Sequence, residues 1–272
     1  MMPSSTHLVV LPSYNTGPRL REVVAGVLAR WRPVVVVIDG STDGSEQPLH
    51  ELARQDAGLS VLVLPRNAGK GAAVLAGASW AHERGFTHAL TMDADGQHVA
   101  AHVPEFMALS RRQPDALVLG RPIFPVNVPA ARLHGRKLSV ALVRGLLLGA
   151  GVEDPLFGFR VYPIAPLLAV LAGRSTGRRY DFDTEAAVRL CWAGVRPFNV
   201  PAPVRYFSRE EGGVSHFHYV RDNLTLVGMH ARLLFWELPW HVGDLLRHRR
   251  RWRTEAAVEL EGPAEPASDA VH

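Results

Sequence analysis

Residues 88–98, HALTMDADGQH, place a short apolar segment directly before two carboxylates, Asp93 and Asp95. Unpaired carboxylates are costly inside a core, so a buried strand tolerates them only where it ends. In open α/β sheets, ligands bind outside the carboxyl ends of the strands. We therefore expect a mostly parallel sheet with both carboxylates at its binding edge.

Short β-branched and aliphatic runs alternate with helical patterns through the first half of the chain, which is typical of a parallel sheet covered by helices. The expected strands are Leu8–Pro12, Val34–Asp39, Val61–Leu64, His88–Asp93 and Ala116–Gly120. The expected helices cover residues 18–30, 46–56, 71–84 and 101–112. The predicted fold class is α/β, with a single Rossmann-like nucleotide-binding sheet flanked by helices.

The second half loses this alternation from about residue 131. Arg132–Gly149 predicts one long helix, whose basic stripe suits a membrane surface and equally a core helix with a charged solvent face. A second amphipathic helix is expected over 221–238. The arginine-rich run 247–253 suits an anionic lipid surface or nucleic acid, and residues 254–272 predict a disordered acidic tail.

Length and composition indicate an ordinary globular protein of 272 residues with a net charge of +4. No apolar segment approaches the roughly 20 residues of a membrane-spanning helix, and the first residues lack a basic region followed by a long apolar stretch. The single cysteine, Cys191, excludes an internal disulfide and suits a reducing compartment. We expect a cytoplasmic protein that is neither exported nor membrane-spanning.

Two carboxylates at positions i and i+2 suit a hard cation, Mg²⁺ or Mn²⁺, which keeps open positions for water and phosphate oxygens. Gln97 could add a neutral oxygen and His98 a nitrogen, although a helix-start or packing role is favoured for His98. An exposed turn at Gly96 is the alternative interpretation. A cation at Asp93 and Asp95 would neutralise a diphosphate leaving group, as in a nucleotide-sugar donor.

Two further loops suit phosphate or nucleotide. Asp39–Ser45 follows a strand and contains turn-forming glycines, and Asn67–Gly71 places Lys70 at a helix start, where backbone N–H groups favour anions. Lys70 is not the lysine of a Walker loop, because Leu64 stands where the first glycine of that loop belongs. The absence of a G-x-G-x-x-G motif after the first strand argues against a dinucleotide-binding dehydrogenase.

Four motifs occur in order: Pro12-Ser-Tyr-Asn15, Asp39-Gly-Ser-Thr-Asp43, Asn67-Ala-Gly-Lys-Gly71 and Asp93-Ala-Asp-Gly-Gln97-His98. In this order they resemble family 2 glycosyltransferases of the GT-A fold, above all the dolichyl-phosphate mannose/glucose synthase-like branch and bacterial lipid-associated members. The resemblance covers about residues 7–235. One departure is Ile38, where the family usually has an acidic residue.

The resemblance implies a nucleotide-sugar site and a metal site. The nucleotide-sugar residues would be Pro12, Tyr14, Asn15, Asp39, Ser41, Asp43, Asn67, Lys70, Asp93 and Ala94. The metal ligands would be Asp93, Asp95 and Gln97.

The second half contributes candidates for catalysis and acceptor binding. The segment Asp154–Arg160 is similar to the one that closes the acceptor side in this family; its Gly158 fits a close backbone approach or a plain turn. Glu185 or Asp181 is a candidate general base toward an acceptor hydroxyl, with Asp154 as a third candidate catalytic residue, whereas Asp183 suits a helix N-cap. The expected acceptor-binding residues are Arg121, Arg132, Arg136, Arg160, Arg205, Ser215 and His216.

The predicted function is inverting transfer of a sugar from a nucleotide sugar to a lipid-linked acceptor by an enzyme peripheral to the inner face of the cell membrane. A polyprenyl phosphate is the expected acceptor. A sugar or lipid hydroxyl is the alternative acceptor. A nucleotidyltransferase of similar fold would open on a glycine-rich loop ending in Thr-Arg, which Leu11–Gly17 does not match. Nucleic-acid binding would leave Lys70, Asp93 and Asp95 without a role.

The chain is expected to form one domain over residues 1–240. Residues 1–121 would form the nucleotide-sugar half and residues 122–240 the acceptor half. Residues 241–272 would be a basic segment and a disordered tail.

Overall fold

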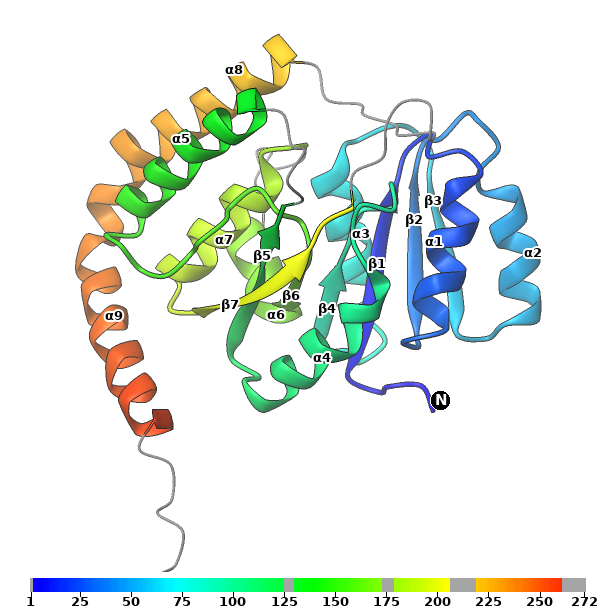
Figure 1. Cartoon of the computed structure of the whole chain (residues 1–272), viewed down its shortest axis with the longest axis horizontal. Helices are drawn as coiled ribbons and strands as arrows, with labels where there is room; N and C mark the ends of the chain where they lie inside the picture. The colour runs from blue at the N-terminus through cyan, green and yellow to red at the C-terminus, as the bar shows by residue number, and fades with distance from the viewer. Residues whose placement is uncertain (1, 125–129, 173–178, 206–218, 261–272) are drawn as a thin grey trace, which may run out of the picture.

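The computed structural model describes residues 2–124, 130–172, 179–205 and 219–260, which contain one seven-stranded sheet in the order β3-β2-β1-β4-β6-β5-β7 (Figure 1). The strands are β1 (His7–Ser13), β2 (Val34–Asp39), β3 (Leu59–Leu64), β4 (His88–Thr91), β5 (Ala116–Ile123), β6 (Arg160–Pro163) and β7 (Arg196–Pro203). The helices are α1 (Arg19–Leu28), α2 (Gln47–Gln55), α3 (Lys70–His82), η1 (Ala100–His102), α4 (Val103–Arg112), α5 (Ala130–Leu146), α6 (Ile164–Leu171), α7 (Phe182–Trp192), α8 (Tyr219–Arg232), η2 (Leu233–Glu237) and α9 (Leu238–Leu260).

The first four strands are parallel. β1 pairs in parallel with β2 and β4, and β2 pairs in parallel with β3. β6 then runs antiparallel between β4 and β5, and β7 lies parallel to β5. The carboxyl ends of β1 to β4 therefore lie along one edge of the sheet, where the loops that follow them gather, at the top of Figure 1.

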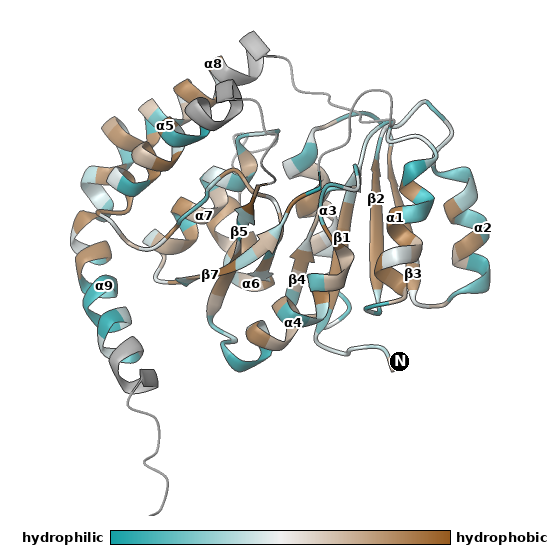
Figure 2. Cartoon of the chain, viewed as in Figure 1, coloured by the Kyte–Doolittle hydropathy of each residue, from teal (hydrophilic) through white to brown (hydrophobic). Residues whose placement is uncertain are grey.

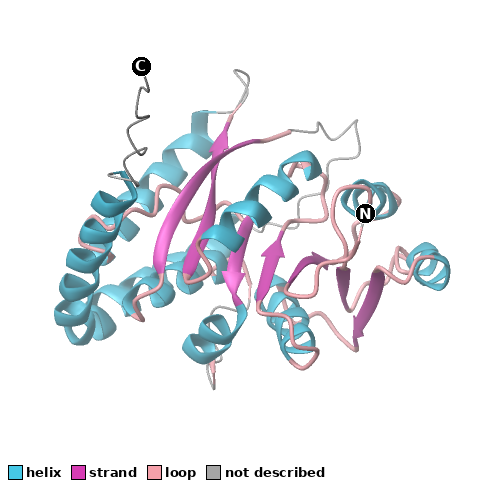
Figure 3. Cartoon of the chain, turned by 90° about the horizontal axis from the view of Figure 1, so that it is seen from below, coloured by secondary structure: helices cyan, strands magenta, loops and turns pink. Residues whose placement is uncertain are grey.

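Both faces of the sheet are covered, and successive side chains of β1 alternate between the two cores. Val9 and Leu11 pack with residues of α1, α2 and α4, whereas Leu8 and Val10 pack with residues of α3, α5, α6 and α7. Figure 3 shows these helices on the two sides of the strands. Burial on both faces explains why the strands are continuous apolar runs in the sequence.

The elements predicted in the first half are confirmed with small shifts at their ends. β6 and β7 were not predicted. β7 contains Pro197, Pro201 and Pro203, which argue against a central strand. It lies at the edge of the sheet, and the positions of the three prolines differ by even numbers, so the N–H groups they lack all belong to one side of the strand.

The C-terminal helices form one continuous arm in which the π-helical η2 joins α8 to α9. The helix expected over 221–238 is confirmed by α8 and η2. The prediction of disorder from residue 254 is wrong as far as Leu260, where α9 ends, and the boundary expected after residue 240 falls inside α9. The arm is held because Leu245 and Trp252 pack into the core. Residues 261–272 lie outside the described part of the chain.

In the part of the chain that the structure describes, no helix combines the length and the apolarity that crossing a bilayer requires.

A buried pair of histidines joins β1 to β4 at the amino end of the sheet. The rings of His7 and His88 stack with centroids 4.3 Å apart, and His7 Nε2 lies 3.2 Å from Ser110 Oγ. Burial, with the nearby His88 and Arg111, lowers the pKa of His7 to about 4. The folded protein therefore keeps this imidazole neutral.

This histidine predicts a loss of stability in mild acid. Between pH 6.5 and 4 the unfolded chain binds a proton at His7 that the folded chain does not, so the free energy of unfolding falls as the pH decreases. The free energy of unfolding, measured by urea denaturation, should fall between pH 7.5 and pH 5 by on the order of 1–2 kcal/mol less in His7→Phe than in wild type. His50→Phe, at an exposed histidine, should keep the wild-type pH dependence. Equal slopes for His7→Phe and wild type would contradict the prediction.

Candidate active site

The loop that follows β4 carries Asp93 and Asp95 and is fixed by its own hydrogen bonds. The Asp93 N–H donates to His98 Nδ1 at 2.9 Å, and the Gln97 N–H donates to Asp95 Oδ1 at 2.9 Å. Gly96 has a φ of +82°, which strains any residue with a Cβ atom. The two carboxylates are therefore held at the carboxyl edge of the sheet.

His98 closes this loop from inside the core. Its ring contacts Phe157 and Phe159, with centroids 4.7 and 5.4 Å away. Burial lowers the pKa of His98 to about 4, although the carboxylate of Asp93 opposes the shift. A neutral ring is required for Nδ1 to accept the Asp93 N–H, so the packing role expected for His98 is confirmed.

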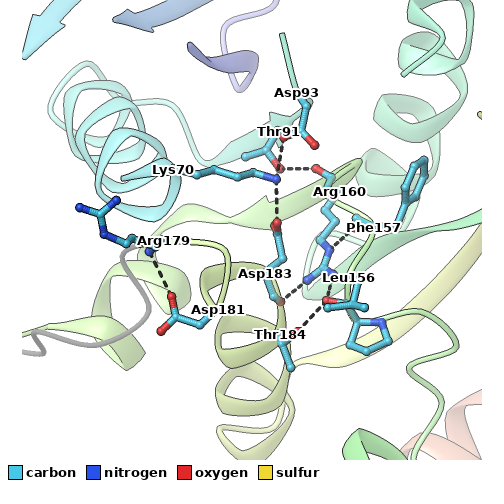
Figure 4. A network of polar contacts seen from close by, with 12 residues as sticks. Lys70, Thr91, Asp93, Leu156, Phe157, Arg160, Arg179, Asp181, Asp183 and Thr184 are labelled. Carbon is cyan, nitrogen blue, oxygen red and sulfur yellow. Dashed lines mark hydrogen bonds and ion pairs between the residues drawn. The ribbon is translucent and has the colours of Figure 1, made fainter. Parts of the chain in front are cut away.

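Lys70, the first residue of α3, joins this loop to α7 (Figure 4). Its Nζ lies 2.6 Å from Asp93 Oδ1 and 2.7 Å from Asp183 Oδ2. Burial would lower the pKa of Lys70, but the attraction of Asp183 and Asp93 outweighs burial and raises the pKa above its usual range. The side chain is thus a fixed cation between two carboxylates.

A close backbone approach completes this cluster. Gly158 O accepts a hydrogen bond from Thr91 Oγ1 at 3.0 Å. A Cβ atom on Gly158 would clash with Lys70 Nζ and would lie 3.3 Å from Asp93 Oδ2. Of the two expectations for this glycine, the structure therefore favours the close approach.

Arg160 was predicted to bind the acceptor, and the structure contradicts this role. The side chain is completely buried and donates to Phe157 O at 2.7 Å and Pro155 O at 2.6 Å, and also to Asp183 O (Figure 4). Arg160 therefore satisfies the backbone carbonyls of the Asp154–Arg160 loop and ties that loop to α7.

Asp39, predicted to contact the nucleotide, is 2% exposed. Its two carboxylate oxygens accept the N–H groups of Ala68 and Gly69 at 2.7 and 2.8 Å. Gly40 has a φ of +63°, and a Cβ atom there would clash with the backbone of Asn67. Asp39 therefore sets the loop that leads into α3, and the structure gives it a positioning role rather than an open binding surface.

The loops after β1 and β2 are joined by hydrogen bonds that were not predicted. Asn15 Oδ1 accepts the Thr42 N–H at 2.8 Å, and Ser41 Oγ accepts the Asn15 N–H at 3.0 Å. Asp43 Oδ2 accepts the Gly17 N–H at 2.9 Å. Asn15, Ser41 and Asp43 therefore lie together, as a shared nucleotide site requires.

The other nucleotide-site candidates differ in exposure. Tyr14 and Asn67 are half-buried at the same edge, whereas Pro12 and Ala94 are buried.

The carboxylates after β4 fit a divalent cation. Burial first, and then the neighbouring Asp93, raise the pKa of Asp95 to about 6, which a bound cation would reverse. In the described residues no Lys or Arg lies within ion-pair distance of Asp95, and no three His, Cys, Asp or Glu side chains form a metal site by themselves. The oxygen donors of Asp93, Asp95 and Gln97 suit Mg²⁺ or Mn²⁺ with ligand oxygens completing the coordination.

Glu185 was predicted as a general base, and the structure contradicts this. It is completely buried, and its two oxygens lie 2.7 Å from Arg189 Nε and 2.8 Å from Arg232 Nη2. Glu237 of η2 binds the same two arginines at 2.7 and 2.6 Å, which closes a ring of four charges. Positions two apart on a helix face opposite sides, so Glu185 points away from the side on which Asp183 meets Lys70.

Asp183 is the site residue that sequence reasoning missed. It was expected as an N-cap, but Asp181 occupies that position and Asp183 lies in the first turn of α7. Asp181 is buried, and its carboxylate accepts the Arg179 N–H at 3.1 Å. Its side chain therefore hydrogen-bonds the backbone of the loop that precedes α7. The run of three carboxylates at the start of α7 was the signal, but the sequence does not show which one faces Lys70.

Two of the predicted acceptor-binding arginines are held by adjacent carboxylates. Arg136 of α5 makes a two-pronged ion pair with buried Asp154, with Nη2 to Oδ1 at 2.9 Å. Arg121 Nε lies 3.0 Å from Glu153 Oε2. Asp154, predicted as a catalytic candidate, therefore orients an arginine.

The remaining acceptor candidates are less constrained. Arg205 is exposed, and its N–H donates to Gln97 O at 2.9 Å, which places it beside the loop of Asp93 and Asp95. The side chain of Arg132 and the whole of Ser215 and His216 lie outside the described residues.

Comparison with known proteins finds related sequences. The sequence model of glycosyl transferase family 2 matches residues 8–162. An undecaprenyl-phosphate mannosyltransferase of Micrococcus luteus is 30% identical over 218 residues, covering 75% of this chain and 85% of the relative. A polyprenol monophosphomannose synthase of Mycolicibacterium smegmatis is 31% identical over 220 residues, covering 78% and 81%.

Among solved structures, the fold is similar to mannosyltransferase PcManGT from Pyrobaculum calidifontis in complex with GDP-Man and Mn²⁺. The TM-score is 0.55 at 17% identity, covering 95% of this chain and 83% of the other. The likeness confirms the predicted GT-A fold.

The ring of four charges predicts how Glu185→Gln behaves. Because the buried carboxylate neutralises two arginines, we expect its loss to lower the free energy of unfolding by about 2–4 kcal/mol in urea denaturation. The activity of the folded protein should change less than about threefold. Glu237→Gln, in the same ring, is the matched variant and should behave alike. A general base would instead show a 10²–10⁴-fold loss of activity at nearly unchanged stability.

Proposed function

The chain belongs to glycosyl transferase family 2, and from this membership we propose that it transfers a hexose from a nucleotide sugar to a polyprenyl phosphate, with inversion. The observation that carries the proposal is that Lys70, Asp93 and Asp95 lie together at the carboxyl edge of the sheet. The names of both relatives, a mannosyltransferase and a phosphomannose synthase, support a lipid phosphate as acceptor.

The donor is proposed to lie over the loops after β1, β2 and β4, with its diphosphate at the amino terminus of α3. Lys70 and the N–H groups of that helix start present positive charge there. A divalent cation on Asp93, Asp95 and Gln97 would supply charge neutralisation of the leaving diphosphate. The Mn²⁺ in the PcManGT complex supports this assignment.

The state of the carboxylates favours a phosphate acceptor over a hydroxyl. A phosphate oxygen is already anionic and attacks without a general base, whereas a hydroxyl needs one. Glu185 is neutralised by two arginines, Asp183 by Lys70 and Asp154 by Arg136. Each of these carboxylates is therefore committed to an ion pair.

Arginines beside the site are the proposed residues that bind the acceptor phosphate. Arg121 and Arg136 pair with the adjacent residues Glu153 and Asp154, so one short segment holds both. Arg205 lies beside the metal loop. Guanidinium groups bind phosphate in a two-pronged manner. Arg132, Ser215 and His216 stay in the proposal as further acceptor contacts.

In this assignment residues 1–121 form the donor half and residues 122–240 the acceptor half, on the cytoplasmic face of the membrane that holds the acceptor.

Donor binding predicts a metal-dependent thermal shift. With Mn²⁺ and a matching GDP-, UDP- or dTDP-sugar at about 100-fold above its Kd, the melting temperature should rise by about 5–10 °C. Asp95→Asn keeps an acceptor for the Gln97 N–H but removes a charge. This variant should therefore lose most of the Mn²⁺-dependent rise in melting temperature. Asp115→Asn, at an exposed position after α4, should behave like wild type. No metal-dependent shift with any of these donors would sink the donor assignment.

Acceptor specificity is tested with the donor identified in that panel. We expect radiolabelled sugar to appear on polyprenyl phosphate and not on the corresponding free polyprenol. Transfer to the free alcohol at a comparable rate would overturn the phosphate assignment and favour hydroxyl glycosylation.

A further inference from the structure

The C-terminal arm exposes a row of large apolar side chains, here called the aromatic face: Leu224, Val227, Phe235, Trp236 and Trp240. Trp240 is 83% exposed and Trp236 69%, although tryptophan is normally among the better buried residues. Met229 and Leu233 of the same arm are buried. Helices α8 and α9, along whose ribbons apolar and polar residues alternate (Figure 2), therefore bury some of their apolar side chains in the core and leave others exposed.

The arrangement is held by the backbone and by buried charge. Pro239 has no N–H, and the π-helical η2 ends two residues before it, as expected where the regular hydrogen-bond ladder is interrupted. Glu237 points inward to the ring with Arg189 and Arg232. Its neighbour Trp236 points outward, so the ring fixes which side chains of η2 face solvent.

Cations continue the same face along α9. Arg247, Arg250 and Arg251 follow Trp240 by 7, 10 and 11 residues, a spacing that places them on one side of a helix. Leu245 and Trp252 occupy the buried side.

The nearby acidic residues leave part of this charge unmatched. Asp244 pairs with Arg247, and Glu255 lies 3.2 Å from Arg251 Nε. In the described part of the chain no carboxylate lies within ion-pair distance of Arg250 or Arg253.

Helix α5 extends the surface beside α8, as Figure 1 shows. Its exposed side carries Leu138, 63% exposed, together with Lys137 and Arg144. Both α5 and α8 begin near the carboxyl edge of the sheet, where the site lies (Figure 1). A flat partner on the aromatic face would therefore also reach the entrance of the site.

We propose that the aromatic face and the arginines of α9 dock on an anionic lipid bilayer, with Trp236 and Trp240 among the headgroups and the arginines against lipid phosphates. Tryptophan prefers the membrane interface because its ring is apolar and its N–H is polar. Arginine near an anionic surface adds binding energy of its own. The proposal deepens the proposed function, on which it rests for the lipid acceptor.

A second copy of this chain fits the surface less well. A two-fold contact sets one end of the patch against the other end in the second copy, so the arginines of α9 would face the apolar side chains of α8 and find no carboxylate partner there. Lipid phosphates supply the opposite charge.

The test is co-sedimentation of the full chain with vesicles of phosphatidylcholine, alone or mixed with phosphatidylglycerol. Binding to the mixed vesicles should be at least about 10-fold tighter than to phosphatidylcholine alone. The double variant Trp236→Ser/Trp240→Ser should weaken binding at least about 10-fold. Arg247→Gln/Arg250→Gln should remove most of the preference for anionic vesicles. Val63→Ser, at a 54%-exposed valine of β3, is the matched control and should bind like wild type.

Two results would overturn the proposal. One is equal vesicle binding by the tryptophan variant and wild type. The other is a wild-type protein that does not bind vesicles but forms a dimer in sedimentation velocity, while the tryptophan variant stays monomeric. That result would make the face a self-association surface.

Failure of docking is distinguishable from failure of the proposed function. Transfer to a short-chain, water-soluble isoprenyl phosphate needs no membrane, so the tryptophan variant should retain it within about twofold of wild type, with an unchanged donor-induced thermal shift. Vesicle binding without transfer to any phosphate would sink the proposed function and keep the docking surface. Transfer in solution without vesicle binding would sink the docking surface alone.

Discussion

The ammonium group of Lys70, held between Asp93 and Asp183, is the contact on which the site depends. It joins the start of α3, the loop after β4 and the first turn of α7 at one point. The rest of the site accommodates it: Gly158 has no Cβ because Lys70 occupies that space, and Asp39 shapes the loop that delivers the lysine. The ammonium group also offsets one of the two carboxylate charges beside the place where a diphosphate is proposed to bind.

Helix α7 connects this cluster to the C-terminal arm. Its first turn presents Asp183 to Lys70, and on its other side Glu185 and Arg189 share the ring of charges with Arg232 and Glu237. Breaking a buried pair leaves an uncompensated charge, so the ring strongly favours one placement of the arm against α7. The same short helix thus positions a residue of the site and the arm that carries Trp236 and Trp240.

The first half of the fold was predictable because each strand is a continuous apolar run that ends in a polar loop, and the loop of Asp93 and Asp95 followed from two charges after such a run. β7 was not, because its prolines are tolerated only at an edge that the sequence does not reveal. Arg160 was assigned to the site because its segment resembles the acceptor side of the family, and Glu185 because it belongs to a run of carboxylates at a helix start. Tertiary contacts bury both, and Lys70 pairs with Asp183 across 113 residues of sequence, a distance at which local patterns carry no information.

A double-mutant cycle between Lys70 and Asp183, measured by urea denaturation, tests this account most directly. Lys70→Met alone strands two carboxylates and should cost about 3–5 kcal/mol. Adding Asp183→Asn should recover part of that loss, because one stranded charge disappears, giving a coupling energy of about 1.5–3 kcal/mol. Costs that add to within about 0.5 kcal/mol would show that the two side chains do not interact and would contradict the central role of Lys70.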